Sequence, residues 1–265
     1  MGLLGPRLPI DVDELEWQLA TFKWLIAEFG EAGDTPLVLP TPQWFPRSEA
    51  SGDAEIADLF GHVRRAAGME QWPCELVAGD QDRPTYAGNA LLLRHEGAAA
   101  PCGTFQVAGE DGSPRILISY NPGLAADTMA LVATFAHELG HYLMSTASSP
   151  PPGGWELHEL HTDLVAVYLG FGIFLANSAR SFSQFQSGGE MGWSSRTQGY
   201  LSEGALVTAL TIFQRLAGRD PADAAPYLKA YLAKDLKSAS AWLAKRHPDM
   251  PASVRAVDLS DYAGQ

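Results

Sequence analysis

The chain is poor in cysteine and in basic residues, and both shortages limit what it can be. Its two cysteines, Cys74 and Cys102, are too few for a disulfide framework, and their spacing fits no zinc motif. Buried thiols are the simpler interpretation. Lys and Arg number 18 against 31 Asp and Glu, which gives a formal net charge of −13. Because no stretch forms a basic stripe, we expect no nucleic-acid partner.

Long apolar runs and a targeting signal are also missing. The longest apolar stretch, 164–176, is too short for a bilayer and contains two glycines. The first ten residues lack a charged head followed by a sustained apolar run, so we expect no signal peptide. These absences predict a cytoplasmic protein with no membrane partner. Hydrophobic residues still make up 46% of the chain, which is ample for a packed interior.

The most informative stretch that is present is His-Glu-Leu-Gly-His at 137–141. Two histidines four positions apart lie on one face of a helix, because a helical turn takes 3.6 residues. Two neutral imidazoles, from His137 and His141, can then hold one Zn²⁺. Glu138 follows the first histidine, where its carboxylate can reach a water that the metal activates. The pattern therefore predicts metal-assisted hydrolysis.

The residues around this motif predict a buried helix over 127–144. The segment has no proline, and Asp127 is placed to cap its first turn. Asn-Pro-Gly at 121–123 marks a turn just before it. A metzincin would need Gly at position 144 and His at position 147. The chain has Met144 and Ala147 there, so that subclass is excluded.

A third ligand is expected downstream, since a catalytic zinc usually takes three protein ligands. The sequence Glu-Leu-His-Thr-Asp at 159–163 has the form Glu-x-x-x-Asp. Together the two motifs resemble those of the gluzincins, the zinc metallopeptidases of thermolysin type. The resemblance implies that Glu159 binds zinc and that Asp163 accepts a hydrogen bond from His137. One departure is that Leu157 and His158 occupy the region where the family often carries Asn.

Three neighbours compete with Glu159 for the role of third ligand. Glu156 is the main rival, because it shares a helix face with Glu159 and Asp163. His158 is a further alternative. His161 lies about 200° around the helix from Glu159, so both cannot face one metal, and we expect His161 to be an exposed polar side chain.

The resemblance also implies a mechanism. The metal polarises the scissile carbonyl, and Glu138 takes a proton from the attacking water and delivers it to the leaving amine. A Tyr or His elsewhere stabilises the oxyanion. Tyr200 is our candidate, with His247 and Arg196 as weaker ones. The expected substrate is a peptide or an unfolded protein. The alternatives are a zinc hydrolase of a non-peptide amide, and a non-catalytic module in which zinc stabilises the fold.

The predicted fold class is α+β. We expect a zincin-like core with a small mixed or antiparallel sheet packed on the motif helix, followed by a mainly helical C-terminal part. Strands are predicted at 75–78 and 89–94, and a hairpin pairs 103–107 with 115–119. One of these hairpin strands could offer its edge to an extended peptide. The predicted parts are 1–50 (helix and Pro-rich linker), 51–180 (metal-binding core) and 181–265 (helices completing the cleft).

Helices and loops complete the prediction. Apolar periodicity predicts helices over 12–29, 55–67, 157–177, 202–217 and within 220–246, with an irregular tail from 249. The loop at 148–154 has the composition of either a flexible connector over an active site or a plain surface loop. The polar segment 181–199 is predicted to border the zinc cleft and to restrict its substrates.

Overall fold

The computed structural model describes residues 5–79, 103–108, 115–186 and 200–262, and most of them are helical. The α-helices are α1 (Val12–Phe29), α2 (Asp53–Ala66), α3 (Thr128–Met144), α4 (His158–Ala166), α5 (Gly172–Gln186), α6 (Glu203–Leu216), α7 (Ala230–Arg246) and α8 (Met250–Ala256). The strands are β1 (Glu75–Ala78), β2 (Gly103–Ala108) and β3 (Arg115–Tyr120). Short helical turns are η1 (Ala32–Asp34), η2 (Pro122–Leu124), η3 (Trp155–Leu157), η4 (Val167–Phe171), η6 (Pro221–Tyr227) and η7 (Leu259–Tyr262). The fold is therefore mixed α+β and mostly helical, as predicted.

The three strands form one mixed sheet in the order β1-β3-β2. Strand β1 runs parallel to β3, whereas β2 pairs with β3 antiparallel. The antiparallel pair confirms the predicted hairpin. Both β2 and β3 contact α3, so the sheet packs on the helix that carries the histidine motif. The predicted strand at 89–94 lies outside the described residues.

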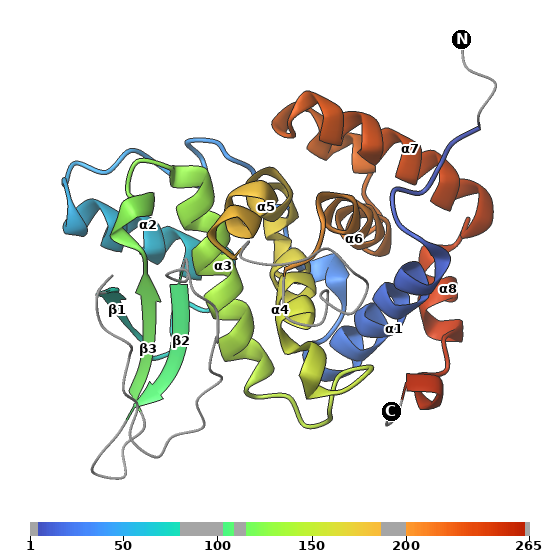
Figure 1. Cartoon of the computed structure of the whole chain (residues 1–265), viewed down its shortest axis with the longest axis horizontal. Helices are drawn as coiled ribbons and strands as arrows, with labels where there is room; N and C mark the ends of the chain where they lie inside the picture. Colours follow the sequence, from blue (N-terminus) through green and yellow to red (C-terminus); the bar gives the residue numbers. More distant parts are fainter. Residues whose placement is uncertain (1–4, 80–102, 109–114, 187–199, 263–265) are drawn as a thin grey trace.

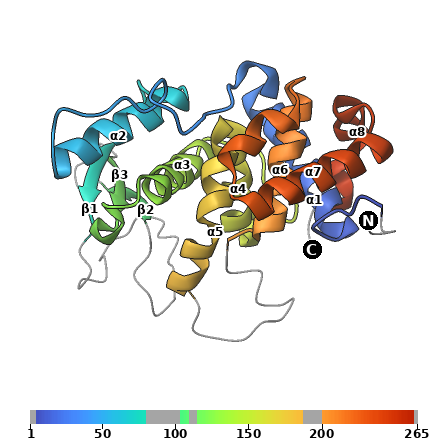
Figure 2. The same ribbon diagram turned by 90° about the horizontal axis from the view of Figure 1, so that it is seen from above.

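Helix α3 lies between the sheet and the helical remainder of the chain (Figure 1). Helix α2 and the strands lie on one side of it, and α4 and α5 contact its other side. Seen from above, α6, α7, α8 and α1 continue away from the sheet (Figure 2). Apolar side chains from Leu15 to Val254 join one buried cluster, whose largest members include Phe135 of α3 and Phe213 of α6. The predicted division of the chain into three parts stays a prediction.

Helices α4 and α5 are joined through the π-helical turn η4 into one central run. Its stretch Trp155–Ala179 has the length and hydropathy of a membrane span, but the whole apolar window is buried inside the protein. A helix at the centre of a folded core passes the same test. The run bends at Gly170, whose φ is +96°. A Cβ there would lie 2.1 Å from the carbonyl oxygen of Pro36, so only glycine fits against the 36–38 segment.

Two sequence predictions about the C-terminal half need correction. Helix α5 continues to Gln186, so the first residues of the segment predicted as a polar loop are helical; 187–199 lie outside the described residues. The tail from 249 is not irregular, because it contains α8 and η7. Asp249 caps α8 by accepting a hydrogen bond from the Ala252 amide at 2.9 Å, and Met250 and Val254 are buried. Seven residues are too few to show apolar periodicity in a sequence.

Candidate metal site

Helix α3 buries His137 and leaves His141 partly buried. It begins at the predicted cap, where Asp127 accepts a hydrogen bond from the Ala130 amide at 3.0 Å. His137 and His141 lie one turn apart on its inner side, with ring centroids 4.8 Å apart and ring planes nearly perpendicular. Both imidazoles can therefore point into one small volume.

Helix α4 brings Glu159 to this volume. Its Oε2 lies 3.1 Å from Nε2 of His137 and 3.6 Å from Nε2 of His141. All three donor atoms lie within 4.8 Å of one another. Tetrahedral ligands about 2.1 Å from a metal are separated by about 3.4 Å, so the spacing suits a metal ion with little adjustment. Among the residues that the structure describes, this buried group is the one that could hold a metal.

Asp163, one turn after Glu159 in α4, accepts one hydrogen bond from His137 and one from the backbone at Leu201. Nδ1 of His137 donates a hydrogen bond to Asp163 Oδ1 at 3.0 Å. The other oxygen, Oδ2, accepts from the Leu201 amide at 2.7 Å. The carboxylate therefore holds His137 with Nε2 facing Glu159, and also fixes the backbone beside Tyr200.

Thr162 contacts Nδ1 of His141 as Asp163 contacts Nδ1 of His137, and the sequence analysis did not identify it. Its Oγ1 lies 3.1 Å from Nδ1 of His141, in a fully buried position. The only signal in the sequence is its place beside Asp163, and a threonine in a helix has many other uses. Adjacent residues of α4 thus anchor the two histidines.

Burial and hydrogen bonding act differently on the two imidazoles. Burial lowers the pKa of His141 to about 4, so at neutral pH it has a lone pair to offer. Burial also opposes a charge on His137, but hydrogen bonds to Asp163 and Glu159 outweigh it and raise its pKa well above the usual range. A metal held at Nε2 of His137 would replace that proton. Burial also raises the pKa of Asp163.

The structure distinguishes Glu159 from Glu156 and His158, two of the alternatives for the third ligand. Glu156 lies in the turn η3 before α4 and is exposed. The Nε2 of His158 lies 3.0 Å from Glu159 Oε1, whereas the two motif histidines lie near Oε2, so His158 contacts the other oxygen of the carboxylate.

His161 is buried, and the prediction that it would be exposed is wrong. Its Nε2 donates to the carbonyl of Pro152 at 2.9 Å, and its ring centroid lies 5.1 Å from that of Trp17 in α1. The N-terminal helix, which is remote in sequence, covers this side chain. Burial lowers the pKa of His161 to about 4.

The loop between the two motifs is held by the same helix. Trp17 Nε1 donates to the Pro152 carbonyl at 3.1 Å, and Trp24 Nε1 donates to Ser149 Oγ at 3.1 Å. Glu28 accepts a hydrogen bond from the Ser148 amide at 2.7 Å. These contacts anchor 148–154 against α1. They thereby join α1 to the segment that leads through η3 into α4, the helix that carries Glu159.

The catalytic candidates take different positions. Glu138 is 3% exposed on α3, beside His137. The ring of Tyr200 lies edge-on to His137 with centroids 4.9 Å apart. His247 stacks on Trp242 at the end of α7. Arg196 lies outside the described residues. Of the candidates for oxyanion stabilisation that the structure describes, Tyr200 is thus the one in contact with the histidine pair.

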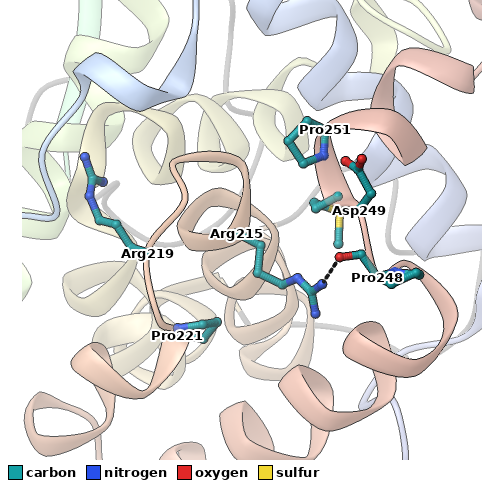
Figure 3. A pocket seen from close by; sticks show the side chains of 7 residues that line it. Arg215, Arg219, Pro221, Pro248, Asp249 and Pro251 are labelled. Atoms are coloured by element: carbon teal, nitrogen blue, oxygen red, sulfur yellow. Dashed lines mark hydrogen bonds between the residues drawn. The ribbon is translucent and has the colours of Figure 1, made fainter.

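One hollow among the described residues lies away from this site. A depression of about 520 Å³ lies among the ends of α6, η6 and α8, lined in part by Arg215, Arg219 and Asp249 (Figure 3). Arg215 donates to the carbonyl of Pro248 within it, while Arg219 donates to the carbonyls of Gly33 and Thr35. No residue of α3 or α4 lines it.

Replacing Asp163 with Asn is expected to weaken metal binding by about 10- to 100-fold, the usual effect of losing a carboxylate behind a ligand imidazole. Asn offers one acceptor where Asp163 accepts from both His137 and Leu201. Its amide nitrogen must therefore face another donor. Competition with a metal chelator measures the change. Asp127→Asn is the matched control: it removes the same charge from the cap of α3, where Asn caps equally well, and its metal affinity should be unchanged. Equal affinities for the two variants would contradict this role for Asp163.

The comparisons with known proteins add no relative. The chain matches no protein-family model, no curated protein and no solved structure. What the structure shows is therefore a mostly helical α+β protein in which His137, His141 and Glu159 form a buried group that could hold a metal ion.

Proposed function

We propose that the protein is a zinc-dependent hydrolase that cleaves peptide bonds in short peptides or unfolded proteins. The observation that carries the proposal is the convergence of His137, His141 and Glu159 within 4.8 Å, and Glu138 follows His137 in helix α3. The resemblance of both motifs to those of the gluzincins supports it. We also propose that the part of the fold around this site is a zincin-like core.

Zinc is the metal that suits these donors. Two imidazole nitrogens and one carboxylate oxygen make the three-ligand set of a catalytic zinc site, which leaves a position for water. Magnesium and calcium prefer oxygen ligands throughout. The Nδ1 atoms of His137 and His141 already have partners in Asp163 and Thr162, so each imidazole has Nε2 for the metal.

The chain's own residues supply the remaining chemistry. When bound, zinc would activate a water and polarise the scissile carbonyl. Glu138 would take the proton of the attacking water and pass it to the leaving amine, a role that a structural site does not need. The hydroxyl of Tyr200 would donate to the developing oxyanion, and the hydrogen bond from Leu201 to Asp163 would hold that part of the chain in place.

The position of β2 favours an extended peptide as the substrate. Phe105 of β2 stacks on His141 with ring centroids 6.5 Å apart, so this strand lies beside the site. Among the described strands β2 pairs only with β3. A peptide could bind along the other edge of β2 through main-chain hydrogen bonds.

Metal removal and restoration test the function. The purified protein should contain close to one zinc per chain and should cleave an unfolded, carboxymethylated protein while leaving its folded form intact. A chelator should abolish cleavage, and added zinc should restore it. Full zinc content without cleavage of any peptide would instead favour a structural zinc, or hydrolysis of a non-peptide amide. A protein that binds no zinc would contradict the proposal itself.

A further inference from the structure

Helices α3 and α4 pack closely at Gly140, inside the histidine motif. A Cβ on Gly140 would lie 3.1 Å from both Cγ2 and the carbonyl oxygen of Thr162, and 3.5 Å from Cγ1 of Val165. The two distances of 3.1 Å are shorter than most Cβ contacts, so a side chain at position 140 would require Thr162 to shift by a few tenths of an ångström. The missing side chain at position 140 therefore allows Thr162 to lie directly against α3.

This close approach brings the Thr162 hydroxyl to His141. The hydroxyl donates to the carbonyl of His158 at 2.7 Å, one turn back in α4. Met144 Sδ, at 3.4 Å, is a weaker acceptor for the same hydrogen. A lone pair of Oγ1 is then left to face Nδ1 of His141 at 3.1 Å, where it accepts the Nδ1–H. This hydrogen bond favours the His141 tautomer with its hydrogen on Nδ1, which leaves the Nε2 lone pair for a metal.

We propose that Gly140 and Thr162 act as a positioning pair that sets the tautomer and the orientation of His141 for metal binding. The inference rests on the metal site of the proposed function and adds two residues to it. Thr162 does not touch the metal; it acts through His141, as Asp163 acts through His137. Its hydroxyl is neutral, so Thr162 holds His141 without adding a charge to the site.

The proposal gives a role to two positions at which the motifs do not specify a residue type. Gly140 occupies a variable position of the histidine motif, and Thr162 a variable position of Glu-x-x-x-Asp. In this chain the two depend on each other. A larger residue at 140 pushes α4 away, and a residue without a hydroxyl at 162 leaves the His141 Nδ1–H without an acceptor.

Two substitutions at position 162 separate hydrogen bonding from packing. Thr162→Val keeps the shape but removes the hydroxyl, whereas Thr162→Ser keeps the hydroxyl and removes one methyl. Chelator competition should show zinc affinity lowered about 10- to 100-fold in Thr162→Val and changed only a few-fold in Thr162→Ser. Nitrogen-15 NMR of the imidazoles in the metal-free protein should show His141 with its hydrogen on Nδ1 in wild type and Thr162→Ser, and a tautomer mixture in Thr162→Val.

Position 140 tests the other half of the pair. Gly140→Ala should lower zinc affinity and disturb the His141 tautomer, as Thr162→Val does. The double variant Gly140→Ala/Thr162→Ser should recover part of the loss, because it removes the Cγ2 that the new methyl meets.

Unchanged affinity and tautomer in Thr162→Val would overturn the proposal, even if Gly140→Ala fails to fold. The NMR measurement needs neither metal nor substrate. It therefore distinguishes a failure of the positioning pair from a failure of the zinc hydrolase assignment.

Discussion

Replacing Glu138 with Gln is expected to abolish peptide hydrolysis while leaving zinc bound. Gln keeps the size of the buried side chain but cannot accept a proton from water. General-base catalysis typically contributes about 10²- to 10⁴-fold, so kcat/KM should fall by about that factor. Zinc content, measured by mass spectrometry of the purified protein, should stay close to one per chain.

Glu156→Gln is the matched control for this variant. It removes the same charge from an exposed residue outside the metal cluster, so both rate and zinc content should match wild type. Glu138→Gln with the wild-type rate would show that another group takes the proton. Glu138→Gln without zinc would make Glu138 a ligand and would require a different base.

Removing a metal ligand is expected to abolish metal binding and activity together, whereas Glu138→Gln should abolish activity alone. Glu159→Gln removes the anionic donor that lies within 3.1 and 3.6 Å of the two histidine nitrogens. His141→Ala removes one imidazole. Each should lower zinc affinity by more than the roughly 10- to 100-fold expected for a hydrogen-bonding partner of a ligand. Chelator competition measures the affinities, and thermal unfolding with and without zinc checks that the variants fold.

Two outcomes would contradict this ligand set. Full zinc occupancy in the double variant His137→Ala/His141→Ala would place the metal elsewhere. Loss of zinc in Glu156→Gln but not in Glu159→Gln would show that the second motif uses its other carboxylate. Because Glu156 is exposed, we do not expect the second outcome.

The sequence by itself determined the parts of the site that depend on local geometry. Helical periodicity put His137 and His141 on one face, and the cap at Asp127 marked where that helix begins. The alternation that predicts a hairpin holds in β2 and β3. The helix at 12–29 was also predicted with its bounds, because an amphipathic stripe and its flanking residues are local signals.

Only the tertiary structure decided which of these faces meet. It turned Glu159, and not Glu156, toward the histidines, and it set Tyr200 against His137. It also covered His161 with Trp17 and anchored the loop after α3 on α1. The short helix α8 escaped prediction for a related reason, since much of its stability comes from burial against distant segments. Gly140 and Thr162 show most clearly what the sequence does not predict. Nothing within its own helix marks either residue, and the role of each depends on the contact between α3 and α4, which local periodicity does not encode.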